Sequence, residues 1–177
     1  MSHPYNPDPV KLFAGIIYKD KEKFEKCICL LKEKFTNIQK ISPLFEFDQT
    51  SYYEKEMGAS LKRSFIIFEG LFDNLKVIDL KYLSYEIEQS FSKEEKRSIN
   101  IDPGYITLHN LVLSTFKGFA HRVLLGNRVW VETTLIYRHN SFDTLEWTYP
   151  DYKYKKTIDF FKEVRNDYYI ELKKNKS

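Results

Sequence analysis

Two short apolar runs in the first half of the chain constrain its fold more than any other feature of the sequence. Residues 10–18 read VKLFAGIIY, and residues 61–70 read LKRSFIIFEG. Each run has the length of a strand and is bounded by polar residues, which is typical of a strand buried inside a sheet. We therefore predict that these two runs are the central strands of one sheet.

Two other segments, 21–35 and 78–91, carry apolar residues at helical spacing, and each follows one of the buried strands. These residues are Phe24, Ile28, Leu31 and Phe35 in the first segment and Leu80, Leu83, Ile87 and Phe91 in the second. Because such a stripe places the apolar side chains on one face, we predict a helix over each segment.

Segments 41–48 and 97–102 are predicted to form the edge strands of the same sheet. Pro43 has no N–H to donate to a neighbouring strand, and the second segment contains the polar residues Arg97 and Asn100. The order strand, helix, strand, strand, helix, strand is the ferredoxin-like βαββαβ pattern. The predicted fold class is therefore α+β, with an antiparallel sheet and helices on one face.

The remainder of the chain is predicted to extend this core. Apolar spacing favours a helix over 106–116 and a final helix over 156–173. Between them, strands over 119–125 and 128–138 are joined by Gly126–Asn127. A two-residue loop that begins with glycine is typical of a type II′ hairpin turn.

These elements predict one folded unit. Residues 1–9 contain three prolines and are expected to be a flexible tail, and residues 10–177 are expected to be a single α+β domain. Within it, residues 10–102 form the βαββαβ core, and residues 103–177 form the helix, hairpin and helix extension. Pro103 and the glycine after it are predicted to form a turn between these two parts.

The predicted hairpin brings together two residues that could form a catalytic pair. If the loop has two residues, His121 lies directly opposite Glu132, close enough for a hydrogen bond. A carboxylate fixes the tautomer of a histidine, so His121 could act as a general acid or base oriented by Glu132. The alternative is a structural pair on a half-exposed sheet, and a register error of one residue would remove the pairing. Arg122 falls on the opposite face of this strand.

Further candidate residues lie near this pair in the sequence. Lys117 and Arg122 are predicted to hold phosphate oxygens, and Tyr149 belongs to an aromatic segment that is either a lid over a ligand or a strap over the sheet. Asp102 and Glu132 could together bind Mg²⁺, which prefers carboxylates and substrate phosphates. Asp102 has a second interpretation as a turn residue.

Three charged residues in the connection 52–60 are predicted to be a solvated helical turn rather than ligands. They are Glu54, Lys55 and Glu56. Cys27 and Cys29 lie two residues apart in a predicted helix and therefore point in different directions, so both are expected to be free thiols, as in a cytoplasmic protein. The N-terminal residues do not resemble a signal peptide, and no apolar run approaches the ~20 residues of a membrane helix.

Charge and motifs exclude few functions. The net charge of +3 permits anionic partners without requiring them. The sequence lacks five common functional motifs. They are the phosphate-binding loop of NTPases, the dinucleotide-binding glycine motif, paired C-x-x-C cysteines, the zinc motif H-E-x-x-H and the G-x-S-x-G serine elbow. Aromatic residues make up 16% of the chain, and we interpret most of them as core residues.

Several segments together resemble an uncharacterised prokaryotic family, domain-of-unknown-function family 4416. They are PVKLFAGI (9–16), FDQTSYYEKEMG (47–58), NIDPGYITLHNLVL (100–113), FKGFAHRVLL (116–125), VETTLIYR (131–138) and WTYPDY (147–152). The resemblance covers nearly the whole chain. It implies no established activity, cofactor or catalytic residue.

Three functions remain open at this point. The first is binding of a phosphate-containing anion, such as a nucleotide, with metal-assisted phosphoryl or nucleotidyl chemistry if Mg²⁺ is bound. The second is a non-catalytic module that binds another protein through an edge strand. The third is RNA binding on an open sheet face, which would show a steep salt dependence. The oligomeric state and the question of whether the protein is an enzyme stay open.

Overall fold

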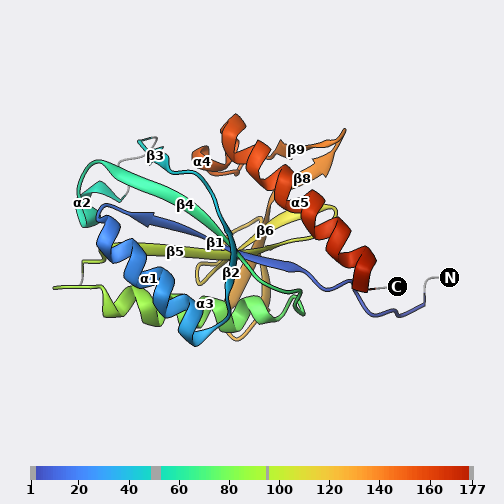
Figure 1. Ribbon diagram of the computed structural model, residues 1–177, viewed down its shortest axis with the longest axis horizontal. Coiled ribbons are helices and arrows are strands. Elements are labelled where there is room, and N and C mark those ends of the chain that lie inside the picture. The colour runs from blue at the N-terminus through green and yellow to red at the C-terminus, as the bar shows by residue number, and fades with distance from the viewer. Residues whose placement is uncertain (1–2, 49–52, 95, 176–177) are drawn as a thin grey trace.

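A computed structural model describes residues 3–48, 53–94 and 96–175. They form a mixed α/β fold around a large antiparallel sheet, with nine strands among the described residues (Figure 1). The strand order is β2-β4-β1-β5-β6-β8-β7, with β3 also paired to β4 and β9 also paired to β8. The predicted antiparallel α+β class is therefore confirmed, although the sheet is larger than a four-stranded core.

The strands and helices follow each other along the chain without a repeat. The strands are β1 (Lys11–Tyr18), β2 (Ile38–Ile41), β3 (Phe45–Phe47), β4 (Leu61–Phe68), β5 (Ile99–Ile106), β6 (Asn110–Thr115), β7 (Val123–Gly126), β8 (Val129–Arg138) and β9 (Ser141–Thr144). The helices are α1 (Lys21–Lys34), α2 (Glu54–Met57), α3 (Lys76–Ser90), α4 (Pro150–Lys153) and α5 (Lys155–Asn175).

The predictions for the first half of the chain are largely confirmed. β1 and β4 are central and pair with each other, and α1 and α3 lie where apolar spacing predicted helices. The predicted strand 41–48 is instead two strands, β2 and β3, on either side of Pro43. Both pair with β4, so this segment does lie at the edge of the sheet.

The prediction that the fourth strand is an edge strand ending in a turn is wrong. β5 continues through Pro103 and Gly104, and it pairs with β1 on one side and β6 on the other. A Cβ atom at position 104 would collide with the Val112 carbonyl oxygen, so glycine is needed here for the close approach of β6. Strand pairing on both sides therefore overrides the turn preference of the Pro–Gly sequence.

The predicted helix over 106–116 is also wrong, because this segment contains β6. Leu111, Val112 and Leu113 are all buried between β5 and β8. Apolar residues at 108, 111 and 112 have the spacing of a helix face, but three consecutive buried residues are typical of a strand covered on both faces. The interior position of β6 explains why its sequence does not alternate.

The hairpin forms one residue later than predicted. Asn127 and Arg128 have φ angles of 45° and 61°, as in a type I′ turn, which requires positive φ at both central residues. Val123 consequently pairs with Val131 rather than with Trp130, and the register shifts between Leu124 and Gly126. β7 begins only after His121, so this residue is not part of the ladder.

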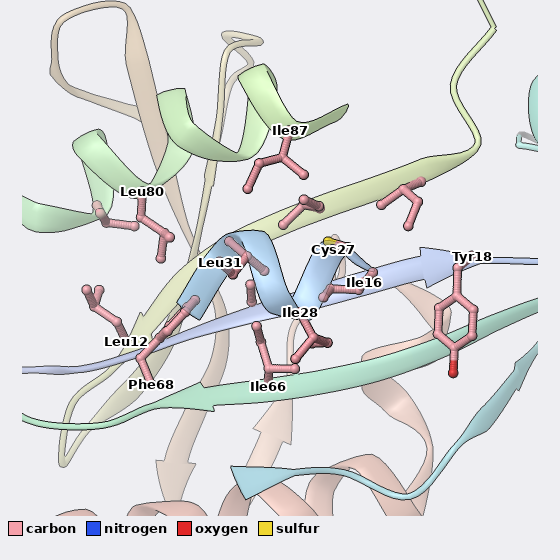
Figure 2. Packing of buried hydrophobic residues seen from close by; sticks show 14 of the residues in the cluster. Leu12, Ile16, Tyr18, Cys27, Ile28, Leu31, Ile66, Phe68, Leu80 and Ile87 are labelled. Carbon is pink, nitrogen blue, oxygen red and sulfur yellow. The ribbon is translucent and has the colours of Figure 1, made fainter. Parts of the chain in front are cut away.

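Alternate residues of β1 pack into two cores on opposite faces of the sheet. Leu12, Ala14 and Ile16 pack with side chains of α1 and α3 (Figure 2). Phe13 packs on the other face with Phe161 of α5 and with β4, β6 and β9. The sheet is therefore covered by helices on both faces, whereas helices on one face were expected. None of the described helices combines the length and the apolar character needed to cross a membrane.

Candidate functional site

A cavity of about 350 Å³ lies where the sheet divides. β5 pairs with β6 only from Gly104 to Ile106, so the first half of β5 has no paired strand on that side among the described residues. Asn100 and Asp102 of β5 line one wall, and Ser114 and Thr115 at the end of β6 line another. The cavity thus arises from the separation of two strands that are paired further along.

Charged and aromatic side chains from distant parts of the chain meet in this cavity. Its cationic residues are Arg63, Lys81, Arg97, Lys117 and Arg122, and its acidic residues are Glu88, Asp102, Glu132 and Asp151. Its aromatic residues are Phe47, Tyr53, Tyr85, Phe116, Tyr149 and Tyr152. Such a mixture of rings and convergent charges is typical of small-molecule sites.

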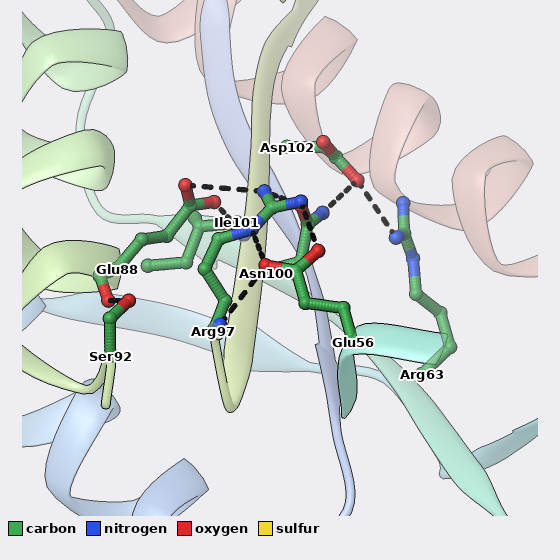
Figure 3. Close-up of polar contacts among 8 residues, drawn as sticks. All are labelled: Glu56, Arg63, Glu88, Ser92, Arg97, Asn100, Ile101 and Asp102. Carbon is green, nitrogen blue, oxygen red and sulfur yellow. Dashed lines mark hydrogen bonds and ion pairs between the residues drawn. The ribbon is translucent and has the colours of Figure 1, made fainter. Parts of the chain in front are cut away.

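Arg97 is held at the cavity wall by Glu56, which was expected to be a solvated residue. The guanidinium group donates from Nε to Glu56 Oε1 at 2.7 Å and from Nη2 to Glu56 Oε2 at 2.9 Å. It also donates to the Asn100 side-chain oxygen at 2.8 Å (Figure 3). These contacts lower the pKa of Glu56, and the hydrogen bond with Arg97 is the main cause.

The network continues from Asn100 to Arg63 at the floor of the cavity. The Asn100 amide donates to Asp102 Oδ2 at 2.8 Å, and Arg63 Nη1 donates to the same oxygen at 3.0 Å (Figure 3). Arg63 is 2% exposed and also faces Asp151 at 3.3 Å. A Cβ at position 15 would collide with this guanidinium group, so Gly15 makes room for it.

A second cluster is built around Glu132 of β8. Glu132 Oε2 accepts hydrogen bonds from Arg122 Nε at 2.6 Å and from His121 Nε2 at 2.9 Å. Arg122 Nη2 also donates to the Tyr149 hydroxyl at 3.0 Å. The His121 ring stacks on Trp147 with centroids 4.8 Å apart.

The contact between His121 and Glu132 is therefore confirmed, but the register that predicted it is wrong. His121 and Arg122 both lie in a turn before β7 and reach the same carboxylate. Arg122 was expected on the opposite face of the strand from His121. That expectation is wrong, because it required the strand to include residues 121 and 122, and β7 begins after them. Because a turn does not alternate its side chains, neighbouring residues can contact one group.

The cavity gathers most of the predicted site residues, with one exception. Lys117, Arg122, Tyr149, Asp102 and Glu132 all line it. The predicted catalytic histidine does not line it and instead packs behind Glu132 among aromatic rings.

Sequence reasoning missed a polar stripe on α3. Lys81, Ser84 and Glu88 are all buried, and their spacing of three and four residues places them on one helix face. The Lys81 ammonium group lies 5.4 Å from the centre of the Phe116 ring. Polar residues repeating at helical spacing beside the apolar stripe were the signal that could have revealed this wall.

Burial shifts the acid–base properties of two carboxyl groups in the cavity. Burial raises the pKa of Glu88 to about 7, while the nearby Lys81 opposes that rise. Glu88 Oε1 accepts a hydrogen bond from the Ile101 amide, and Oε2 lies 3.7 Å from Arg97. Burial also raises the pKa of Asp151, against the effect of Arg63.

The predicted Mg²⁺ ligands contact guanidinium groups. Asp102 accepts from Arg63 and Glu132 accepts from Arg122. Across the described ranges, no group of three or more His, Cys, Asp or Glu residues is placed to hold a metal ion. The charges nearest to these two carboxylates are therefore cations supplied by the protein itself.

Comparison with known protein families gives a match over most of the chain. The family described as "Domain of unknown function (DUF4416)" matches residues 8–168. No curated protein and no solved structure matches the chain.

Proposed function

The chain belongs to this family of unknown function, and we propose from its site that the cavity binds a small phosphate-containing anion, such as a nucleotide. The three cavity arginines are each held by at least one carboxylate. Their charges are therefore offset within the protein, whereas Lys81 contributes a further positive charge to the cavity.

Lys81 is the observation that carries this proposal. Its side chain is 9% exposed, and among the described residues its ammonium group lies over the Phe116 ring at 5.4 Å and has neither a hydrogen bond nor an ion pair. Glu88, which interacts electrostatically with Lys81, has a pKa of about 7 and is only partly ionised at neutral pH. A buried cation without a paired carboxylate is costly unless an anion neutralises it.

The size and lining of the cavity support a ligand larger than a simple ion. Its volume of about 350 Å³ falls in the range of about 300–1,000 Å³ that is common for small-molecule sites. Tyr85, Phe116 and Tyr149 supply rings against which a planar group can pack. Lys117, beside Phe116 in the sequence, also lines the cavity and brings a second ammonium group to it.

His121 has a positioning role in this proposal rather than a catalytic one. It holds Glu132 from behind, and Trp147 and Phe119 fix its ring. If the cavity supports a reaction, Glu88 is the better candidate for proton transfer, because it lines the cavity and titrates near neutral pH.

We also propose that the first half of the chain is a ferredoxin-like core. The spatial order β2-β4-β1-β5 and the placement of α1 and α3 in one core support it. In this proposal, β6 to β9 and α5 extend that core and complete the cavity.

Isothermal titration calorimetry of the intact protein tests the proposed function. The ligands are pyrophosphate and nucleoside monophosphates, in a phosphate-free buffer with and without Mg²⁺. We expect binding by the natural protein and at least a tenfold loss of affinity in Lys81→Met, which removes the charge and keeps the length of the side chain. The expected loss is about that of one hydrogen bond to a charged group. Lys117→Met is expected to weaken binding in the same direction.

Lys76→Met is the matched control, because Lys76 lies on the same helix and forms an exposed pair with Asp79. It should bind as the natural protein does. Failure of every phosphate compound to bind at millimolar concentration, or equal affinity in Lys81→Met, would contradict the proposal. The protein-interaction alternative would then be favoured, with the exposed Phe119, Val123 and Leu124 around edge strand β7 as its surface.

A further inference from the structure

One oxygen of the Glu132 carboxylate lacks a partner. Oε2 accepts two hydrogen bonds, from Arg122 and His121. Oε1 is buried and has no hydrogen-bond partner within the described parts of the chain. A buried carboxylate oxygen that has lost its contact with water normally requires a donor.

The surroundings of Glu132 identify the kind of donor that would satisfy it. The residue is 3% exposed, lines the cavity and is fixed by two hydrogen bonds, so it cannot readily turn to find another partner. The remaining oxygen of this carboxylate can only accept a hydrogen bond. A ligand in the cavity would therefore complete the site with an N–H group.

We propose that the ligand is a nucleotide whose base carries an exocyclic amino group, and that this amino group donates to Glu132 Oε1. This inference rests on the proposed function, because the phosphate is assigned to Lys81 and Lys117 in the same cavity. A carboxylate acceptor is the side chain that recognises the amino group of cytosine. The aromatic rings that line the cavity offer surfaces for the base to pack against.

The carboxylate also discriminates against bases that present a carbonyl oxygen at the same place. A uracil or hypoxanthine carbonyl would put a second acceptor against Glu132 Oε1 and leave both oxygens without a donor. Cytosine and uracil, or adenine and hypoxanthine, differ chiefly in this group. Each pair is therefore a matched comparison of donor and acceptor at one position.

Calorimetric titration of the intact protein with CMP, UMP, AMP and IMP tests the inference. We expect at least tenfold tighter binding of the amino member in one pair or in both, because only that member donates to the buried oxygen. Equal affinities within both pairs would overturn the inference and leave the phosphate proposal standing. Tighter binding of UMP and IMP would also overturn it. Failure of all four to bind would overturn it as well, and the titration with pyrophosphate then decides whether the phosphate proposal stands.

Glu132→Gln gives an independent readout. The glutamine oxygen can accept from Arg122 and His121, which leaves its NH₂ group at the position of Oε1. The preference should then reverse towards UMP or IMP. A folded variant that keeps the preference for the amino bases contradicts the assignment. If the variant does not fold, the four-ligand comparison on the natural protein decides alone.

Discussion

At the scale of single residues, Glu88 shows how the interior changes the chemistry of a side chain. It lies on α3 beside the half of β5 that β6 leaves unpaired, where the Ile101 amide is available to donate to it. Burial raises its pKa from 4.5 to about 7, with Lys81 and Arg97 lowering it and Asp102 raising it. A glutamate at this position in an isolated helix would show no such shift.

This shift predicts a pH-dependent stability that Glu88→Gln removes. Between pH 4.5 and about 7 the folded protein binds more protons at Glu88 than the unfolded chain does. The free energy of unfolding therefore falls as pH rises through this window, by at most about 3 kcal/mol, and this contribution is constant above it. Glutamine has no such titration.

Urea unfolding of both proteins from pH 5 to pH 8 measures the effect. The free energy of unfolding of Glu88→Gln, relative to the natural protein, should increase with pH up to about 7. The comparison cancels the titration of Glu56 and Asp151, which both proteins share. Parallel pH profiles would show that Glu88 does not titrate in this window.

At the scale of elements, the junction of β5 and β6 determines whether the cavity exists. The strands pair over only three residues on each side, and Ser114 donates to the Pro103 carbonyl where they separate. Neither the Pro–Gly sequence nor the apolar spacing of the next segment predicts this pairing. Both are local signals, whereas the pairing depends on β1 and β8 holding β5 and β6 in place.

Gly104→Ala tests this junction. The added methyl group would collide with the Val112 carbonyl oxygen, which belongs to the backbone of β6 and cannot rotate away. We expect a loss of about 1–3 kcal/mol in the free energy of unfolding, as for other overpacked sites. Weaker binding of anions should accompany it, because Asp102 and Ser114 lie on either side of the junction.

Gly118→Ala is the matched control for this substitution. The atoms nearest to its added methyl group belong to the Trp130 ring, at 3.1 Å, and a side chain can adjust. It should change the free energy of unfolding by less than about 1 kcal/mol. An equal loss in both variants would mean that the effect is general to glycine substitution and not specific to the junction.

At the scale of the whole molecule, α5 joins the two halves of the chain. Phe161 is fully buried and contacts Phe13 of β1 and Phe65 of β4, which lie in the first half. Leu135 and Phe142, from β8 and β9, belong to the same cluster. The predicted core of residues 10–102 therefore leaves one sheet face without its cover when it is considered alone.

We consequently expect the chain to unfold in one transition that Phe161→Ala shifts as a whole. Removal of this ring should lower the free energy of unfolding by about 3–5 kcal/mol. Urea unfolding followed by far-UV circular dichroism and by the fluorescence of Trp130 and Trp147 should give coincident curves. Tyr169→Ala, on an exposed face of the same helix, should have little effect.

Two separate transitions would contradict this prediction. So would a Phe161→Ala variant in which only one probe shifts, because the halves would then be independent domains. In that case the division at residue 102 would be a physical boundary rather than a description of the sequence.

The sequence by itself determined β1, α1, β4, α3, β8 and α5, because their apolar residues repeat with the period of a single element. It also brought His121 and Glu132 together, although by a register that the structure does not have. Only the tertiary structure decided that β5 and β6 separate, that Lys81 and Glu88 face the gap, and that His121 lies outside it. Strand pairing joins residues that are distant in the sequence, so local periodicity cannot specify where paired strands part and leave a cavity.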